Sequence, residues 1–368
     1  MTVKVKDIIC FMNEIAPKNL AEQWDNVGLL VGCKEQSVNR VMVILDATSK
    51  VVEEAVGKKI DMLVTHHPVI FKGLKSLDEE NAVPKILAKL IRNNISVFCA
   101  HTNLDAADGG VNEQLAKVLG LTEIRNLNSY REEKLFKLVV FVPVGHIDEV
   151  RNAICNAGAG WIGNYSDCSF MTQGTGTFKP LDGSNPFIGK QGNIEKVSEY
   201  RLETIVPEKV LKRVIEAMIS AHPYEEVAYD IYPLEIKGKE YGLGKVGILE
   251  EPMSRENFVS TVKKQLGIDH LRLIGEMPKE IRKVAVFCGS FDENWHGIIR
   301  EKADVLVTGD IKYHAAVEAA ERKICVIDAG HYATEKVIVP VLAKKLNERF
   351  PGIEVISSCT ESDPIRTI

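Results

Sequence analysis

Three histidines and two carboxylates in this chain have the residue types and positions of a metal site. The first two are His66 and His67, which follow the apolar run 62–64 after one threonine, and such a run is typical of a buried strand. Neutral imidazole is the commonest metal-binding side chain. Adjacent residues of a strand point to opposite sides, so both rings can reach one pocket only if the chain turns there. Pro68 favours such a turn, because proline cannot continue a strand ladder.

Two other apolar runs end in a histidine and a carboxylate four residues apart. His101 and Asp105 follow the run 96–99, and His331 and Glu335 follow the run 324–327. Open α/β sheets bind ligands at the carboxyl ends of their strands, so these groups are expected to meet at one edge. The predicted metal ligands are His66, His67, Asp105, His331 and Glu335.

This set is too large for one catalytic zinc ion, which takes three protein ligands. It suits two divalent ions about 3.5–4 Å apart, held by a bridging carboxylate and a bridging water. Glu335, one helical turn after His331, is the carboxylate expected to reach both ions. The nitrogen and oxygen donors fit Zn, Fe or Mn better than Ca or Mg. For His101, Asp310 and His314, which lie near equivalent strand ends, we expect a role in orienting ligands.

The elements that must position these groups occur twice in the chain. Segment 41–45 matches segment 284–287, and 61–67 matches 304–310, both at an offset of 243 residues. The segment that ends in His331 matches the one that ends in His101 at an offset of 230 residues. Strands that alternate with helices of this length indicate βαβ units and a largely parallel sheet. One α/β half is therefore predicted to be present in two copies.

The segment between the copies has a different pattern. Two strand-like runs, 137–143 and 201–207, both end in Val-Pro and are each followed by a helical pattern, and 227–232 is a last strand. Two β-α-β units of this length make a ferredoxin-like domain. We predict an α/β fold in which duplicated halves, residues 1–129 and 238–368, form one split domain around an inserted ferredoxin-like α+β domain, residues 130–237.

Composition excludes several classes of protein. With 46 basic and 51 acidic residues, the net charge is −5, which gives no electrostatic footprint for nucleic acid. The longest apolar runs are too short for a membrane span, and residues 1–15 form an amphipathic pattern rather than a signal peptide. The eight cysteines contain no Cys-x-x-Cys pair, which favours reduced thiols. We expect a cytoplasmic protein.

Two other motifs suggest chemistry that their context does not support. Gly242, Gly244 and Gly247 spell G-x-G-x-x-G, but a strand rather than a helix is predicted to follow, which argues against a dinucleotide site. His222 to Glu226 contains metal-binding residue types, and a turn between helix and strand explains this segment equally well.

Five stretches together resemble the Nif-three-like family, whose members are also catalogued as GTP cyclohydrolase 1 type 2 homologues. They are Trp24–Leu29, Thr65–Pro68, His101–Asp105, Thr308–Asp310 and Gly330–Glu335. The resemblance implies a dinuclear metal centre, with ligands that match the five predicted here, and assembly into a hexameric toroid. Segments 174–178 and 222–226 resemble the PII and CutA-type insert of some bacterial members.

Two hypotheses about function follow. The first is a metal-dependent hydrolase, in which two cations lower the pKa of a bridging water towards about 7 and supply hydroxide. If the substrate is a guanine nucleotide, hydroxide adds at C8, the imidazole ring opens and formate leaves. His101 is the candidate general acid or base. The second hypothesis is a non-enzymatic metal-binding or regulatory protein, whose inserted domain senses a small ligand.

Overall fold

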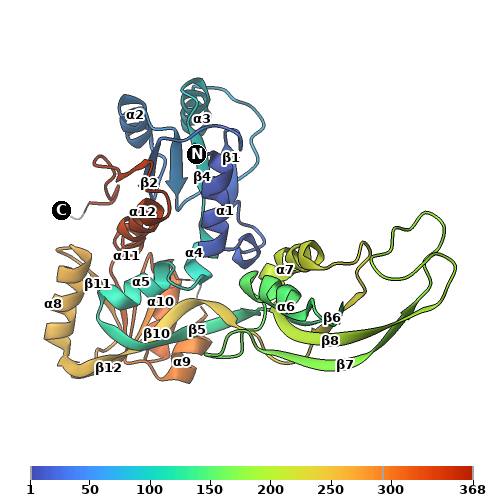
Figure 1. Cartoon of the computed structure of the whole chain (residues 1–368). Coiled ribbons are helices and arrows are strands. Elements are labelled where there is room, and N and C mark those ends of the chain that lie inside the picture. Colours follow the sequence, from blue (N-terminus) through green and yellow to red (C-terminus); the bar gives the residue numbers. More distant parts are fainter. Residues whose placement is uncertain (1, 292–293, 367–368) are drawn as a thin grey trace. The chain divides into compact units, whose positions relative to one another are not determined.

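The computed structural model describes residues 2–291 and 294–366. It divides into two compact units (Figure 1). Unit 1 combines two distant parts of the chain, Met1–Arg131 and Tyr241–Ile368. Unit 2 is the segment between them, Glu132–Glu240.

The first sheet of unit 1 has the strand order β1-β4-β3-β2-β15. Strands β2, β3, β4 and β15 are parallel neighbours, and β1 runs antiparallel to β4. The strands are β1 (Gly28–Val31), β2 (Arg40–Ile44), β3 (Met62–Thr65), β4 (Ser96–Cys99) and β15 (Glu354–Ser357). The helices of this part of the chain are α1 (Val5–Ile15), η1 (Lys18–Leu20), α2 (Ser49–Gly57), α3 (Ala82–Arg92), α4 (Thr102–Ala106) and α5 (Val111–Val118).

The second sheet of unit 1 has the strand order β11-β14-β13-β12-β10-β5. Strands β12, β13 and β14 are parallel, and β10 and β11 run antiparallel to their neighbours β12 and β14. The strands are β5 (Leu121–Glu132), β10 (Glu240–Ser254), β11 (Arg272–Ile274), β12 (Glu280–Ser290), β13 (Val305–Gly309) and β14 (Val326–Asp328). The helices are α8 (Arg255–Leu266), α9 (Trp295–Glu301), α10 (Tyr313–Glu321), α11 (His331–Glu335) and α12 (Ile338–Arg349).

Alternating side chains of each sheet enter different cores. In β2, Val41 and Val43 join a large core that also contains Val284 and Val286 of β12. Met42, between them, points to the opposite face of the sheet and packs in a smaller core with α2 and α3. Because side chains alternate across a strand, two faces that are both covered require nearly continuous apolar runs. This explains why the strands that precede the histidines are uniformly apolar.

The predicted duplication of α/β halves is confirmed by the sheets. The order β1-β4-β3-β2 in the first sheet is repeated as β11-β14-β13-β12 in the second. In both copies three parallel strands are flanked by one antiparallel strand. The carboxyl ends of β3, β4, β13 and β14 therefore present corresponding loops.

The outer strands of the two sheets do not follow the division of the sequence into halves. β15, near the C-terminus, pairs with β2 of the first sheet, and Glu354 lies opposite Arg40. β5, from the N-terminal part, lies beside β10 in the second sheet (Figure 1). Each sheet thus contains a strand from the other half. This exchange of strands joins the two halves into one split domain, as predicted.

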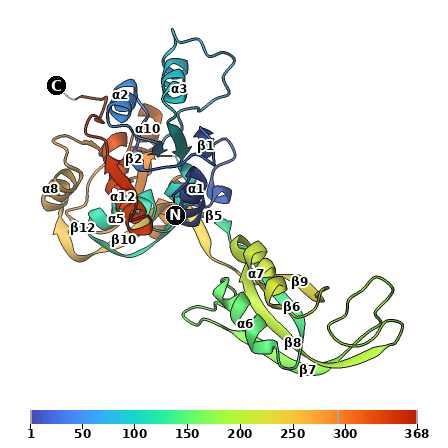
Figure 2. The same ribbon diagram turned by 45° about the horizontal axis from the view of Figure 1, so that its top comes forward.

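Unit 2 contains one four-stranded sheet with the order β7-β8-β6-β9, in which all neighbours are antiparallel. Its elements are β6 (Leu135–Pro143), α6 (Ile147–Asn156), β7 (Ser169–Phe178), β8 (Glu195–Pro207), α7 (Glu208–Ala221) and β9 (Tyr229–Leu234). The two helices lie on one face of this sheet (Figure 2) and share a core with β6 and β8. The succession of elements is that of a β-α-β-β-α-β motif.

No helix within residues 2–291 and 294–366 combines the length and the apolar character that a membrane span needs.

Removal of unit 2 is expected to leave a folded unit 1. The chain enters and leaves unit 2 at adjacent points, since the Glu133 amide donates to the Lys239 carbonyl oxygen at 2.8 Å. Replacing residues 133–239 by a short Gly/Ser linker should therefore give a soluble protein whose metal content, measured by elemental analysis, equals that of the full chain. Insertions are tolerated at such neighbouring chain ends. A shortened protein that folds but binds no metal would show that unit 2 supplies a ligand.

Candidate metal centre

The histidine pair lies at the carboxyl end of β3, as the pattern of apolar residues indicates. The amides of His66 and His67 donate to the carbonyl oxygens of Ile44 and Leu45, so the backbone stays attached to the end of β2. The chain bends at these residues, and the two ring centroids lie 4.9 Å apart. His66 is fully buried. Both imidazoles therefore serve the same site.

All four imidazoles of the site are held through their Nδ1 atoms. Nδ1 of His66 donates to the carbonyl oxygen of Ala100 at 3.0 Å. The other three rings each bond to a carboxylate, and the pairs are His67 with Asp46 at 3.0 Å, His101 with Asp25 at 2.9 Å, and His331 with Asp310 at 2.8 Å. Such bonds fix the tautomer of a ligating histidine and leave Nε2 as the free donor atom.

Asp105 and Glu335 lie on short helices that start at or next to a histidine. Because residues four apart share a helix face, Glu335 on α11 comes to 3.1 Å from His331 Nε2. The other oxygen of Glu335 lies 3.6 Å from His66 Nε2, and an Asp105 oxygen lies 3.5 Å from the same atom. Both carboxylates are almost completely buried.

The five predicted ligands are brought together, in two groups of donors that share Glu335. The first group is Nε2 of His67, Nε2 of His331 and Oε2 of Glu335, which are 3.0, 3.1 and 3.2 Å apart. The second is Nε2 of His66 with Asp105 and Oε1 of Glu335. Donors at 2.0–2.2 Å from one ion lie about 3.0–3.5 Å from each other, so the first triangle fits a single cation.

Two buried atoms in this cluster lack hydrogen bonds. Nε2 of His66 and Oε2 of Glu335 are inaccessible to solvent and make no hydrogen bond of suitable geometry among the described residues, although Oε2 lies 3.0 Å from His67 Nε2 and 3.1 Å from His331 Nε2. A buried polar atom without a partner costs about 1–3 kcal/mol. A cation would satisfy both atoms, and His67, His331 and Glu335 form a set that could hold one. The residues present therefore fit a metal.

Gly289 provides the space for the Glu335 carboxylate. A Cβ atom at this glycine would lie 2.2 Å from Oε1 of Glu335, and its φ of +60° is in the left-handed region. The Gly289 amide donates a hydrogen bond to Thr334 Oγ1 at 3.0 Å, which holds the end of β12 against α11. A glycine at the end of β12 thus allows the shared carboxylate to reach both groups of donors.

The pKa values of the site reflect burial opposed by close charges. Burial alone would lower the pKa of His66, but Asp105 and Glu335 outweigh it and raise the pKa. Burial would also lower the pKa of His67, but close contacts with Asp46 and Glu335 raise it to about 10. Burial also opposes protonation of His331, but Glu335 and Asp310 raise its pKa to about 9. Without a cation, His67 and His331 therefore carry an extra proton at neutral pH.

The carboxylates respond to burial in different ways. Burial alone would raise the pKa of Glu335, but the positive charge of His66 and the contacts with His331 and His67 hold it well below its usual value. For Asp105, burial prevails over the attraction of His66 and His101 and raises the pKa. Glu335 is thus the permanent anion of the site.

The three residues expected to orient ligands have different positions. Asp310 bonds to Nδ1 of His331 at 2.8 Å, which is the contact that its expected role requires. His314 is exposed and its ring contacts Tyr313, so the expectation is wrong for this residue. His101 is held by Asp25 through Nδ1, so it does not orient a ligand by an Nδ1 hydrogen bond of the kind that Asp310 makes. Its ring instead forms, with His66 and His67, a second set that could hold a metal ion.

Asp25 and Asp46 are residues that the sequence patterns did not single out. Asp46 lies two residues after the end of β2, so the rule that placed the other groups at strand ends also applies to it. Asp25 lies before β1, and only its place in the Trp-Asp-Asn segment sets it apart. Burial alone would raise the pKa of Asp25, but hydrogen bonds from His101 and Thr102 lower it to about 2. Asp25 is therefore an anion that fixes His101.

Both misleading motifs have structural roles. The three glycines of G-x-G-x-x-G lie inside strand β10, where Cβ atoms at Gly242 and Gly247 would collide with backbone atoms of β5. They allow two strands to pack closely and open no helix. His222 uses both ring nitrogens, since Nε2 donates to the Phe141 carbonyl oxygen and Nδ1 accepts from the Tyr224 amide. Neither nitrogen is free for a metal.

Comparison with known proteins gives consistent matches over the whole chain. The model of the family Duf34/NIF3 (NGG1p interacting factor 3) matches residues 3–364. A "GTP cyclohydrolase 1 type 2 homolog" of Bacillus subtilis is 42% identical over 367 residues, which cover 99% of this chain and 98% of the relative. A homologue of the same name from Halalkalibacterium halodurans is also 42% identical, over 98% of both chains.

Solved structures of related proteins also resemble the structure of this chain. A Bacillus cereus protein related to NIF3 superimposes with a TM-score of 0.93 at 40% identity, over 100% of both chains. A Staphylococcus aureus protein gives a TM-score of 0.76 at 30% identity, over 100% of this chain and 99% of that one.

Proposed function

Because the chain belongs to the Duf34/NIF3 family, we propose that its donor cluster binds two divalent ions and hydrolyses a small-molecule substrate. The observation that carries this proposal is the position of Glu335, whose two oxygens face different groups of imidazoles. One ion would be held by His67, His331 and Glu335, and the other by His66, Asp105 and Glu335. The mixed nitrogen and oxygen donors favour Zn, Fe or Mn.

When bound, a pair of divalent ions supplies an acidified water molecule and polarises the bond that is attacked. The chain's own residues prepare the site for this chemistry. Asp46 and Asp310 hold the rings of His67 and His331 in position, and the burial of His66, Asp105 and Glu335 keeps bulk water away from the donors. The negative charge of Glu335 would offset part of the charge of the two cations.

His101 is proposed to exchange a proton with the substrate. Asp25 holds its Nδ1, which leaves Nε2 on the side of His66 and His67. The ring also has edge contacts with two exposed aromatic side chains, Trp24 at 5.9 Å and Phe71 at 5.7 Å between centroids. A flat ring such as a purine base could stack on these two side chains beside His101. This arrangement supports a nucleotide as the substrate.

The relatives named GTP cyclohydrolase 1 type 2 homolog suggest the reaction to test first. Hydrolysis of a guanine nucleotide would open the imidazole ring and release C8 as formate. Protein loaded with Zn²⁺, Fe²⁺ or Mn²⁺ should be assayed against a panel of nucleotides, with formate and phosphate measured in parallel. Metal binding without any product from the panel would favour the second hypothesis, a regulatory metal-binding protein. Assembly into a hexameric ring, also proposed from the family, is measured by light scattering.

Replacing His101 by glutamine is expected to separate proton transfer from metal binding. General acid or base catalysis contributes about 10²–10⁴-fold, so kcat should fall by that factor while two metal ions per chain remain. His314→Gln removes an exposed imidazole away from the cluster and should change neither quantity. Loss of a metal ion from His101→Gln would show that His101 is a ligand instead.

A further inference from the structure

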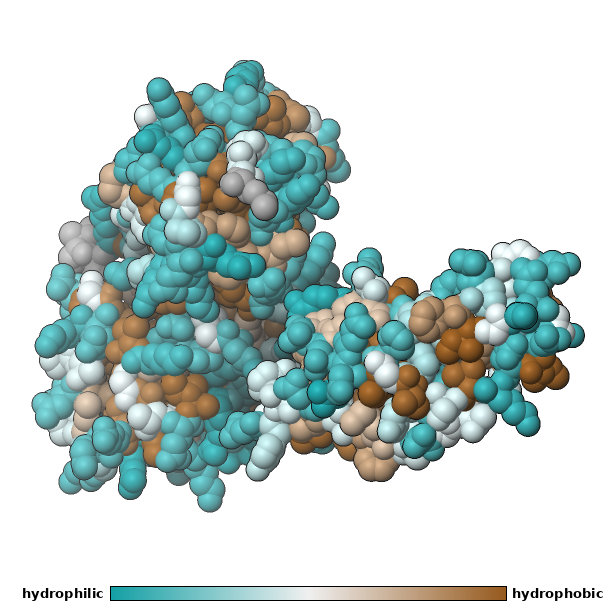
Figure 3. Space-filling view, in the orientation of Figure 1, coloured by the Kyte–Doolittle hydropathy of each residue, from teal (hydrophilic) through white to brown (hydrophobic). Residues whose placement is uncertain are grey.

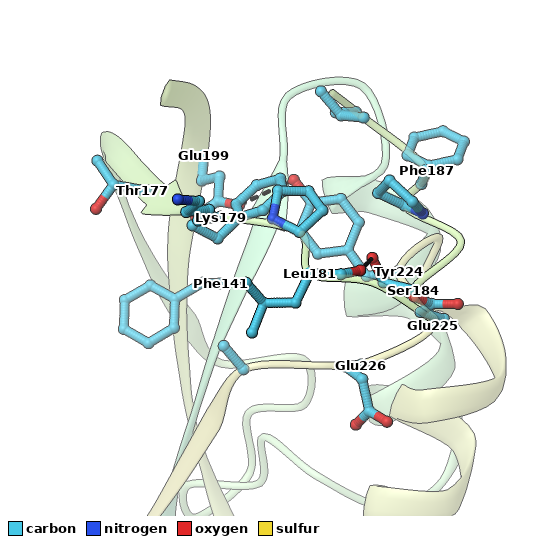
Figure 4. A pocket seen from close by; sticks show the side chains of 16 residues that line it. Phe141, Thr177, Lys179, Leu181, Ser184, Phe187, Glu199, Tyr224, Glu225 and Glu226 are labelled. Atoms are coloured by element: carbon cyan, nitrogen blue, oxygen red, sulfur yellow. Dashed lines mark hydrogen bonds between the residues drawn. The ribbon is translucent and has the colours of Figure 1, made fainter. Parts of the chain in front are cut away.

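Unit 2 contains a cavity of its own, with a volume of about 450 Å³. Its walls come from β6, from the ends of β7 and β8, from the loop between these two strands, and from the turn after α7 (Figure 4). The volume lies in the range of small-molecule sites, about 300–1,000 Å³. All lining residues belong to unit 2. We call this space the unit 2 cavity.

Aromatic side chains form much of the wall of the unit 2 cavity. The Tyr224 ring lies 5.9 Å from the Phe178 ring and 6.2 Å from the Phe187 ring, measured between centroids, and Phe141 also lines the space. Phe187 and Leu181 of the loop are more than half exposed. Apolar side chains also reach the surface of unit 2 in the space-filling view (Figure 3). A bound molecule would cover the exposed side chains of the loop.

One carboxylate is buried in this mostly apolar wall. Glu199 lies on β8, an interior strand of the sheet, and is 8% exposed. Among the described residues its side chain has one hydrogen bond, which Tyr224 donates to Oε1 at 3.0 Å, and no ion pair. Burial and this contact raise the pKa of Tyr224, so its hydroxyl remains a donor. A carboxylate has about four acceptor positions, so Glu199 retains capacity for another donor.

The neighbours of Glu199 keep it in place. A Cβ atom at Gly176 on the adjacent strand β7 would lie 2.0 Å from Oε2 of Glu199, so the missing side chain makes room for the carboxylate. His222 holds the turn that carries Tyr224, through the Phe141 carbonyl oxygen. Glu225 accepts a hydrogen bond from the Asn185 amide at 2.8 Å and so fastens the loop beside the cavity.

The charged residues of the cavity wall favour a positively charged ligand. Glu199, Glu225 and Glu226 line the cavity, and the only lining residue of opposite charge is Lys179. Three carboxylates against one ammonium disfavour phosphate and carboxylate ligands. Aromatic faces next to carboxylates are suited to organic cations, which are attracted by both.

We propose that the unit 2 cavity binds a small organic cation with an apolar body, whose ammonium or guanidinium group bonds to Glu199. The aromatic rings and Leu181 would contact the apolar body. This site does not depend on the proposed metal centre, whose residues all belong to unit 1.

Three probe molecules with one body and different charges test the proposal on the full chain: 2-phenylethylammonium, 2-phenylethanol and phenylacetate. Isothermal titration calorimetry should give about tenfold tighter binding of the cation than of the alcohol, and no binding of phenylacetate. Glu199→Gln should abolish the preference for the cation. Equal binding of cation and alcohol to the unchanged protein, or a preference that survives Glu199→Gln, would overturn the proposal.

A pair of glycine variants supplies a matched control in the same strand. Gly176→Ala places a methyl group against the Glu199 carboxylate and should weaken binding of the cation about tenfold. Gly174→Ala adds a methyl group where no atom lies within 4 Å and should leave binding unchanged. Thermal melting checks that both variants fold. Equal affinities of the two variants would contradict the assigned position of Glu199.

Discussion

Replacement of Glu335 by glutamine is expected to reduce the metal content from close to two divalent ions per chain to less than one. The two oxygens of Glu335 lie 3.0 Å from His67 Nε2 and 3.6 Å from His66 Nε2, so this side chain faces both groups of donors. An amide keeps the shape of the side chain but removes the charge and one acceptor oxygen. In a single substitution both proposed cations lose the shared negative charge, and one of them also loses its oxygen ligand.

The fold is expected to survive this substitution. The strands β3 and β13 provide the core, and the donors lie at its edge. Elemental analysis of purified protein gives the metal content, and circular dichroism checks the fold. Glu361→Gln is the matched control, because Glu361 is also partly buried and accepts hydrogen bonds from the amides of Leu45 and Asp46 beside the site. Full occupancy in Glu335→Gln would exclude a shared carboxylate.

Metal affinity is expected to rise steeply with pH. A histidine must lose its proton before its nitrogen binds a cation. In the metal-free protein, the pKa values of His67 and His331 are raised to about 10 and about 9, so both rings are protonated at pH 7. If a cation displaces both protons, its affinity should increase about a hundredfold per pH unit below pH 9 and level off above pH 10.

Competition with a chelator of known affinity measures this dependence. Calorimetry in two buffers with different enthalpies of ionisation counts the protons that are released. A heat of binding that is the same in both buffers would contradict the expected release. The raised pKa values also stabilise the metal-free fold below about pH 6.5, and this contribution is lost as the pH rises through 9 to 10.

The repeated parallel strands and the edge that carries the donors could be predicted from the sequence. The apolar runs before His66 and His101 are buried on both faces, which makes them recognisable as strands. Parallel neighbours bring their carboxyl ends to one edge, so a local pattern was sufficient to bring five distant residues together. The four-residue spacing of His331 and Glu335 likewise predicts a helix, and the structure contains this helix as α11.

The contacts between distant segments could not be predicted in this way. The pairing of β15 with β2 and the position of β5 beside β10 depend on strands far apart in the sequence, and no local pattern encodes which edges meet. For the same reason His101 was expected to orient a ligand, although its partner is Asp25, 76 residues away. The cavity of unit 2 arises from a loop and two strand ends whose residues have no common spacing.

The position of β15 has a consequence for synthesis of the chain. β2 ends at residue 44, and its outer neighbour begins at residue 354, so 309 residues (353 − 44) must be translated between the two strands. At about 5–20 residues per second, this takes roughly 15–60 seconds. During that time β2 is an open, largely apolar edge, the kind of strand that pairs with other chains. A ribosome that stops before residue 354 would release a product in which this edge stays uncovered.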